Sequence, residues 1–252
     1  MDDFGFTKDT IYTRYSSFIS PEKIKGLSVL DVGCYHAAAG AYVLSNGAKE
    51  YTGVDFDIDS VNTSNTNLEK YYKNYSWRIL HSSISDYLKV NDKKFDIIFL
   101  SRTLHGMSYD SVETLVALSN ICDSIVIESG SSVKPLLKIR KLLKEKKLSN
   151  NSGIKELLYF LEYEYPGMEF MKNTNSDFYN VRHSLGFLKT LFNRLGFVED
   201  LSSYEKLKSM YPEEYGFGSD ENLDETVVGK YIIKFDKVSS GKPMSWKDLK
   251  NV

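Results

Sequence analysis

Short apolar runs alternate with amphipathic stretches over the first half of the chain. Each run has the length of a β-strand and is rich in Val, Ile, Leu and Phe, which is typical of strands buried on both faces of a parallel sheet. Strands are expected at residues 28–32, 51–55, 77–80, 95–100 and 124–128, and helices at residues 37–44, 61–72 and 110–120. This alternation predicts an α/β fold with a doubly wound, Rossmann-like sheet and right-handed crossovers.

The pattern changes after residue 128. Residues 134–148 predict a basic amphipathic helix, and Ser152 caps a further helix rich in Leu and Tyr that ends at Pro166. Residues 169–180 are polar and show no regular pattern. We interpret residues 134–183 as an insertion over the carboxyl edge of the sheet.

Regular alternation resumes near the C-terminus. Residues 184–195 carry one apolar stripe and predict a helix, which Gly196 ends. Two strands are expected to follow, one from Phe197 onward and one at residues 230–235. No linker divides the chain, so residues 1–252 are expected to form a single domain.

Composition excludes several classes of protein. The 252 residues include 32 Lys and Arg against 34 Asp and Glu, and this balance argues against nucleic-acid binding by bulk charge. The two cysteines, Cys34 and Cys122, exclude a disulfide scaffold and suit a reducing, cytoplasmic setting. The four histidines are scattered, so no metal site is expected. No apolar run approaches the ~20 residues of a membrane span, and the first residues lack the features of a secretory signal.

Two strand ends carry the candidate chemistry, because ligands of open α/β sheets bind beyond the carboxyl ends of the strands. Asp31 and Gly33 lie at the first end, and Asp55 lies at the second, where a carboxylate can bind both hydroxyls of a ribose. A dinucleotide site needs a second glycine where Tyr35 stands, and Asp31 would repel a pyrophosphate. S-adenosylmethionine has a cationic ammonium and sulfonium and no phosphate, so the charges favour this cofactor.

At these motifs the sequence resembles the class I S-adenosylmethionine-dependent methyltransferases. The resemblance is carried by residues 29–34, 52–55 and 95–105, and by Leu195-Gly196-Phe197 near the end. It implies a seven-stranded, mostly parallel sheet whose last strand is antiparallel. It also implies that adenine lies between the ends of strands three and four. We assign these residues to the cofactor site: Asp31, Gly33, Tyr35, Asp55, Phe56, Ser83, Ile84 and Ser101.

Catalysis depends on the acceptor. A hydroxyl does not ionise at neutral pH and would need a general base, whereas an amine already has a lone pair to donate. His105 follows strand four, where the methyl group should point, and is the favoured base; His183 is the second candidate, and either histidine could be structural instead. Arg102, Tyr179 and Arg182 are the expected substrate-binding residues.

The acceptor is expected to be a small molecule, possibly anionic or a carbohydrate. Residues 134–148 carry seven Lys and Arg against the single Glu145. These positive charges form either a solvated helix face or a surface that attracts a phosphorylated acceptor or RNA electrostatically. Nucleic acid is disfavoured because the motifs for base methylation are absent. We therefore expect O-methylation of a sugar or phosphorylated metabolite, with residues 134–183 as the acceptor lid. An NAD-dependent oxidoreductase or epimerase and a non-catalytic cofactor-binding scaffold remain the alternatives.

The N-terminal stretch is expected to form a helix across the mouth of the cofactor site. Its aromatic and apolar side chains either close the site or pack in the core. They are Tyr12, Tyr15, Phe18 and Ile19.

Overall fold

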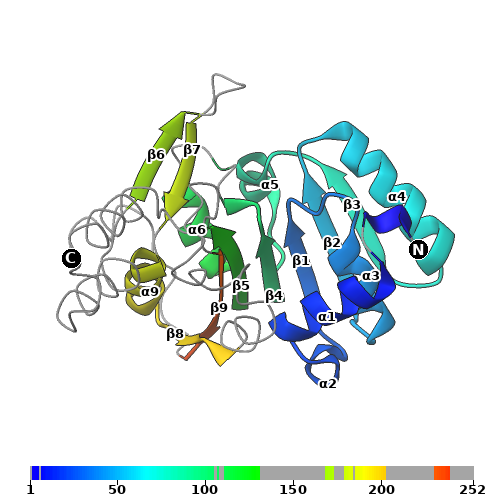
Figure 1. The fold of residues 1–252 in the computed structure, drawn as a ribbon, viewed down its shortest axis with the longest axis horizontal. Helices are drawn as coiled ribbons and strands as arrows, with labels where there is room; N and C mark the ends of the chain where they lie inside the picture. Colours follow the sequence, from blue (N-terminus) through cyan, green and yellow to red (C-terminus); the bar gives the residue numbers. More distant parts are fainter. Residues whose placement is uncertain are drawn as a thin grey trace, which may run out of the picture.

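A single mixed sheet of seven strands forms the centre of the molecule (Figure 1). The computed structural model describes residues 2–5, 7–104, 107, 111–130, 168–172, 179–183, 185–202 and 230–238. The strand order is β3-β2-β1-β4-β5-β9-β8. The strands are β1 (Ser28–Val32), β2 (Glu50–Asp55), β3 (Trp77–His81), β4 (Phe95–Ser101), β5 (Cys122–Gly130), β8 (Phe197–Asp200) and β9 (Lys230–Lys237). Strands β1 to β5 are parallel, and β9 runs antiparallel to both of its neighbours, as the resemblance implies.

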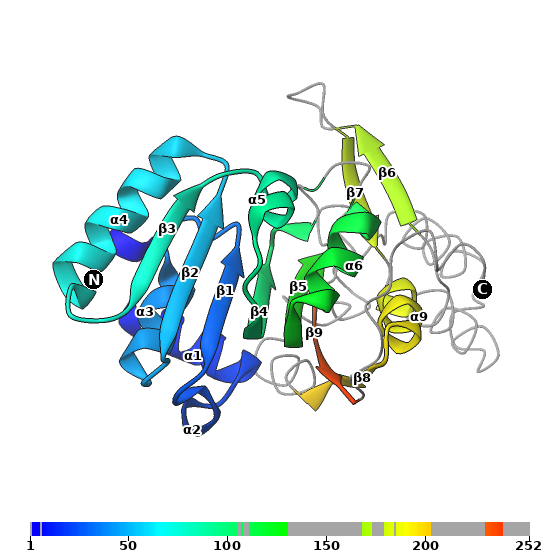
Figure 2. The same ribbon diagram turned by 180° about the vertical axis from the view of Figure 1, so that it is seen from behind.

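Helices cover both faces of this sheet. Figure 1 shows α1, α3 and α4 on one face, and Figure 2 shows α5 and α6 on the other. The bounds of the helices are α1 (Lys8–Phe18), α2 (Pro21–Ile24), α3 (Ala38–Ser45), α4 (Ile58–Tyr72), α5 (Ile84–Val90), α6 (Ser111–Asn120) and α9 (Leu185–Arg194), with a short 3₁₀ helix, η1 (Asp2–Phe4), before them. The doubly wound arrangement is therefore confirmed.

Strand β1 lies at the switch point of the sheet. All five of its residues are buried, with β2 on one side and β4 on the other. The chain crosses from β3 over β2 and β1 to reach β4, so the strand order reverses beside β1. The carboxyl ends of β1 and β4 therefore frame the crevice in which this class of sheet binds ligands.

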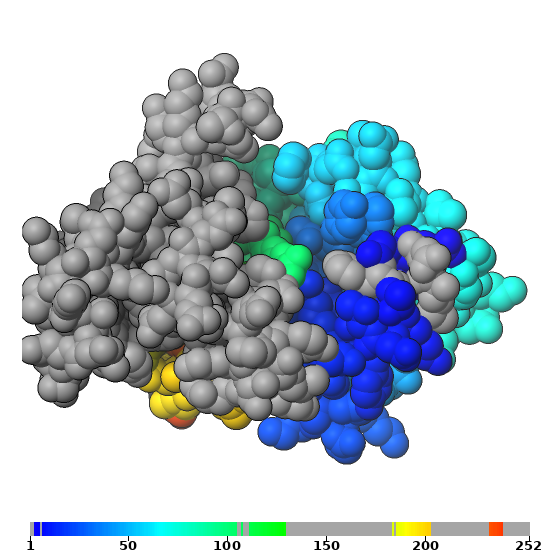
Figure 3. All heavy atoms as spheres, in the orientation of Figure 1, coloured from blue at the N-terminus to red at the C-terminus, as the bar shows by residue number. Residues whose placement is uncertain are grey.

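The N-terminal helix α1 packs on the sheet through its aromatic residues. The rings of Tyr15 and Phe18 lie 6.2 and 6.1 Å from the ring of Phe99 in β4, measured between centroids. Thr7 caps the helix by accepting a hydrogen bond from the backbone of Thr10. In the space-filling view this N-terminal region, in dark blue, forms part of the molecular surface (Figure 3). The expected N-terminal helix is thus confirmed.

The sequence interpretation was wrong at two places. Residues 169–180 were expected to be irregular, but β6 (Met168–Lys172) and β7 (Tyr179–His183) form a two-stranded antiparallel sheet. Helix α5 was not expected at all. The helices expected at residues 134–148 and from Ser152 lie outside the described residues. Among the helices that are described, none has the length and apolar character needed to cross a membrane.

Candidate functional site

A cavity of about 920 Å³ opens at the carboxyl ends of β1, β2 and β4. This volume lies near the upper end of the range of small-molecule sites. The cavity is lined by strand ends, by the turns that follow them and by helix α1. Among the residues assigned to the cofactor from sequence, all eight line it: Asp31, Gly33, Tyr35, Asp55, Phe56, Ser83, Ile84 and Ser101.

The turn after β1 is built around Gly33. Its φ of +71° lies in the left-handed region, which favours glycine. A Cβ atom at this position would lie 2.3 Å from Oγ1 of Thr103, so the two turns after β1 and β4 are in close contact. The Thr103 hydroxyl donates a hydrogen bond of 2.8 Å to the carbonyl of Val32 and fixes that contact.

The same turn continues with two left-handed residues that are not glycine. Tyr35 has φ of 49° and Ala37 has φ of 61°, so the backbone keeps a tight turn without glycine at these positions. The Tyr35 ring stacks on His36 and remains 54% exposed. Ser64 donates a hydrogen bond to the Tyr35 carbonyl. This turn is therefore held by side-chain contacts rather than by glycine alone.

Asp31 is a buried carboxyl group in the cavity wall. It is 3% exposed and accepts a hydrogen bond of 2.7 Å from the hydroxyl of Tyr51. The pKa of Asp31 is raised to about 7, mainly by burial and in part by the nearby Asp55, while the Tyr51 hydrogen bond and Arg14 act in the opposite direction. A cation bound beside Asp31 would stabilise its ionised form.

Asp55 connects the ends of β2 and the turn after β1. Its two carboxylate oxygens accept backbone hydrogen bonds, one from Tyr35 at 2.9 Å and one from Asp57 at 3.0 Å. A carboxylate has about four acceptor positions, so these two bonds leave capacity for the hydroxyls of a ribose. Next to it, Phe56 is 77% exposed and presents its ring at the rim of the cavity.

Ser83 caps helix α5 at the other side of the cavity. Its hydroxyl accepts a hydrogen bond from the backbone of Asp86 and donates one to the Asp86 carboxylate. A hydroxyl oxygen has two lone pairs, so Ser83 can accept one further hydrogen bond, such as that from an adenine amine. Ile84 lies directly after it and is partly buried against the core.

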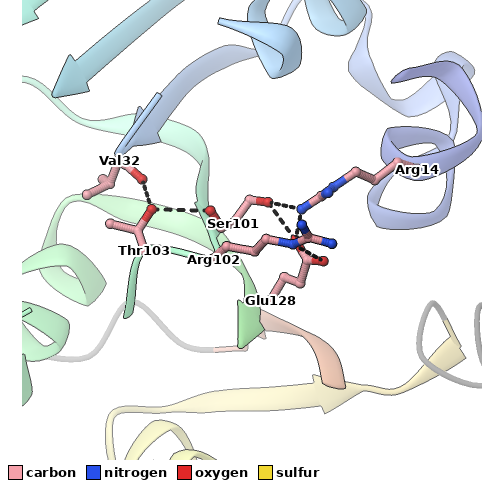
Figure 4. Close-up of polar contacts among 6 residues, drawn as sticks. All are labelled: Arg14, Val32, Ser101, Arg102, Thr103 and Glu128. Carbon is pink, nitrogen blue, oxygen red and sulfur yellow. Dashed lines mark hydrogen bonds and ion pairs between the residues drawn. The ribbon is translucent and has the colours of Figure 1, made fainter. Parts of the chain in front are cut away.

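A buried ion cluster closes the end of the cavity at β4 and β5 (Figure 4). At its centre is Glu128, which is 0% exposed. Arg14 of helix α1 forms an ion pair with Glu128, and the hydroxyl of Ser101 donates a 2.6 Å hydrogen bond to the same oxygen. Arg102 lies 3.4 Å from the other oxygen, measured from Nε. Helix α1 and the end of β4 therefore converge on one buried carboxylate of β5.

The cluster also fixes the turn after β4. Arg102 has φ of 59°, and its backbone N–H donates a 2.9 Å hydrogen bond to the carbonyl of Glu128. Its side chain is 43% exposed and lines the cavity, so the predicted substrate-binding position of Arg102 is at the site.

Of the two histidines assigned to catalysis, the structure describes only one. His183 is 0% exposed, lies 3.2 Å from the Ser111 hydroxyl, and is not one of the described residues that line the cavity. Burial lowers its pKa to about 4, which is typical of a neutral core histidine, so its position does not support a catalytic role. His105 lies outside the described residues. So do the side chains of Tyr179 and Arg182, whose backbones are in β7.

Sequence reasoning missed several cavity residues. Arg14, Cys34 and Thr103 line the cavity, and Glu128 binds the side chains of two lining residues, Arg14 and Ser101. The sequence did contain a signal for Glu128, because an acidic residue stands there at the end of a nearly continuous apolar strand. Arg14 carried no comparable signal, since charged residues on an amphipathic helix are usually solvated.

The site fits S-adenosylmethionine better than a dinucleotide. Its carboxyls, Asp31 and Asp55, suit an ammonium and a ribose and would oppose a pyrophosphate. Moreover, the Tyr35 N–H, which a dinucleotide site would use for phosphate, is already bonded to Asp55. Asp31, Asp55 and the turn at Gly33 are therefore the residues suited to hold the cofactor.

Comparisons with known proteins agree with this geometry. A family model described as "Methyltransferase domain" matches residues 29–122, which run from β1 to the start of β5. No curated protein matches the sequence significantly.

Solved structures share the fold at low sequence identity. Magnesium protoporphyrin IX methyltransferase from Synechocystis PCC 6803, solved with bound S-adenosylmethionine, is 10% identical, with 91% of this chain and 78% of that chain covered and a TM-score of 0.54. An S-adenosylmethionine-dependent methyltransferase from Clostridium acetobutylicum ATCC 824 is 11% identical, with 90% and 92% covered and a TM-score of 0.51. The N-terminal domain of EvdMO1, crystallised with S-adenosylhomocysteine and D-fucose, is 10% identical, with 94% and 83% covered and a TM-score of 0.53.

These similarities and the cavity lead to one assignment. The matched domain contains the turn at Gly33 and both cavity carboxyls, Asp31 and Asp55. Residues 29–122 therefore match a methyltransferase domain, and the chain has the fold of solved S-adenosylmethionine-dependent methyltransferases.

Proposed function

We propose that this methyltransferase acts on a small hydroxyl-bearing molecule, and that the reaction is O-methylation of a sugar or a phosphorylated metabolite. One observation carries the proposal: a single cavity of about 920 Å³ extends from Asp55 at the end of β2 to Arg102 after β4. A volume near the top of the usual range for one ligand leaves space for a small acceptor beside the cofactor.

The two ends of the cavity suit different groups. Asp55 and Ser83 supply hydrogen-bond acceptors for the nucleoside, whereas Arg102 supplies a guanidinium at the opposite end. A guanidinium binds phosphate and carboxylate in a bidentate manner, which supports an anionic acceptor group there. In this proposal residues 134–183 form the acceptor lid, with Tyr179 and Arg182 in contact with the substrate.

The cofactor supplies a methyl group on a positively charged sulfur, and the protein must align the acceptor oxygen with it. The cavity does this by holding both molecules in one desolvated space. A hydroxyl acceptor also requires removal of its proton, for which we propose His105 as general base. His183 is not proposed, because it is fully buried and bonded to Ser111.

The test is methyl transfer to a panel of acceptors, followed by release of S-adenosylhomocysteine. The panel should contain neutral sugars including D-fucose, sugar phosphates, small amines and RNA. We expect turnover with a sugar or sugar phosphate, and His105→Ala should lower that turnover by about 10²–10⁴-fold with unchanged cofactor affinity. Turnover with amines or RNA alone would refute the proposal. Saturable binding of a nicotinamide dinucleotide would revive the oxidoreductase alternative.

A further inference from the structure

Helix α1 brings a cation into the wall of the cavity. Arg14 lines the cavity and its side chain is only 11% exposed. A buried guanidinium is costly unless a structure holds it in place, and here Glu128 and Ser101 do so. Both of these contacts use Nη2 of the guanidinium.

Arg14 and Asp31 form a pair of opposite charges in the cavity wall. Both residues line the cavity, and both exert an electrostatic effect on the neighbouring Tyr15. The charge of Arg14 also counteracts the rise in the pKa of Asp31 that burial causes, so the two groups are within electrostatic reach of each other. The amino-acid part of S-adenosylmethionine is a zwitterion, with an ammonium and a carboxylate on one carbon atom. A wall with one anion and one cation is complementary to it.

We infer that Arg14 binds the carboxylate of the cofactor's amino acid, and that Glu128 and Ser101 hold the guanidinium in position for this contact. Asp31 would then face the ammonium of the same amino acid. The inference depends on the cofactor and not on the proposed acceptor, so it stands or falls separately from O-methylation.

Helix α1 becomes part of the cofactor site in this arrangement. The buried carboxylate of Glu128 belongs to β5, Ser101 belongs to β4, and Arg14 comes from a helix some hundred residues earlier in the chain. Figure 4 shows the Arg14 side chain reaching from α1 to the ends of both strands. Glu128 and Ser101 are positioning residues, since they act through Arg14.

The first test needs no substitution. Calorimetry on the unmodified protein should compare S-adenosylhomocysteine with its decarboxylated analogue, S-adenosyl-3-thiopropylamine, which keeps the ammonium and lacks the carboxylate. We expect the analogue to bind about 10- to 100-fold more weakly, the size of a charge-assisted hydrogen bond. Equal affinity for the two ligands would overturn the inference, because no group would then recognise the carboxylate.

The second test assigns that preference to Arg14. In Arg14→Met the preference for the carboxylate should disappear, with the decarboxylated analogue bound within about twofold of its affinity for the unmodified protein. Arg14→Lys keeps the charge and should retain part of the preference. Lys8→Gln, an exposed position of the same helix, is the matched control and should retain all of it.

Two results would refute the role of Arg14. An equal loss of affinity for both ligands in Arg14→Met would show that the residue only supports the fold. Loss of the preference in Arg102→Gln, with Arg14→Lys and Arg14→Met unaffected, would assign the carboxylate to Arg102 instead.

Glu128→Gln tests positioning: it should reduce the carboxylate preference and leave binding of 5′-methylthioadenosine, which lacks the amino acid, within about twofold. If Arg14→Met does not fold, Arg14→Lys and Glu128→Gln still test the assignment through the same ratio of affinities.

Discussion

Replacement of Gly33 by alanine tests the close contact between the turns after β1 and β4. An L-residue at φ of +71° costs about 1–2 kcal/mol of backbone strain. The new Cβ would lie 2.3 Å from Oγ1 and 2.7 Å from Cγ2 of Thr103, so that side chain must move, at about 1–3 kcal/mol for overpacking. Its movement breaks the hydrogen bond to the Val32 carbonyl, at about 1 kcal/mol more. The free energy of unfolding should fall by about 3–6 kcal/mol in total.

Gly26→Ala is the matched control for the strain alone. Gly26 has φ of +81°, and a Cβ there would meet no heavy atom within 4 Å, so only about 1–2 kcal/mol should be lost. Urea unfolding followed by circular dichroism measures both variants, and calorimetry measures S-adenosylhomocysteine binding. We expect binding to weaken in Gly33→Ala alone, because Gly33 and Thr103 line the cavity. Equal destabilisation of the two variants would refute the steric argument, as would a Gly33→Ala/Thr103→Ala double variant whose losses are simply additive.

Three further predictions concern other cavity residues. Asp55→Ala should abolish S-adenosylhomocysteine binding in calorimetry, whereas Asp59→Ala, at an exposed position of α4, should not change it. Burial raises the pKa of Asp31 to about 7, so between about pH 4 and 7 the native protein holds a proton that the unfolded chain has lost, and the free energy of unfolding falls as the pH rises through that window. Asp31→Asn should remove this pH dependence in urea unfolding at pH 5 and 7.5. An unchanged pH dependence would contradict the raised pKa of Asp31. Ser83→Ala removes the cap of α5 and should lower the free energy of unfolding by about 0.5–2 kcal/mol; no change in the urea midpoint would show that the cap contributes nothing.

The parallel core could be predicted because its sequence is locally consistent. Residues 28–32 and 95–100 are mostly apolar runs, and such runs fit strands covered on both faces. The cofactor site could be predicted for a related reason, since Asp31, Gly33 and Asp55 lie at or next to strand ends. Their place in the fold is set by local sequence and by one rule about the carboxyl edge of a sheet.

Helix α5 and the strand pair β6–β7 depended on weaker signals. Helix α5 has seven residues, too few to show a clear helical period, although Ser83 and Asp86 mark its start. In β7 the sequence Tyr-Asn-Val-Arg-His alternates with the period of a strand, but it lies in a polar segment whose pairing partner was not apparent. Short elements of this kind depend on tertiary contacts more than on their own pattern.

The ion cluster at Glu128 could not be predicted for a different reason. It joins Arg14, Ser101 and Glu128 from parts of the chain that no local pattern relates. Each residue by itself has an ordinary explanation, as a solvated helix charge, a strand-end hydroxyl and a strand-end acid.

Burial nevertheless gives the cluster a consequence that sequence alone does not show. A carboxylate that is 0% exposed is costly unless cations and hydrogen-bond donors surround it, and removal of one partner of such a pair commonly costs about 3–5 kcal/mol. The ion pair with the buried Glu128 carboxylate, which needs a cationic partner, therefore attaches helix α1 to the carboxyl ends of β4 and β5. The same attachment places Arg14 in the wall of the cavity that Asp31 also lines. Stability of the N-terminal helix and recognition of the cofactor's amino acid should consequently change together in any variant of Glu128.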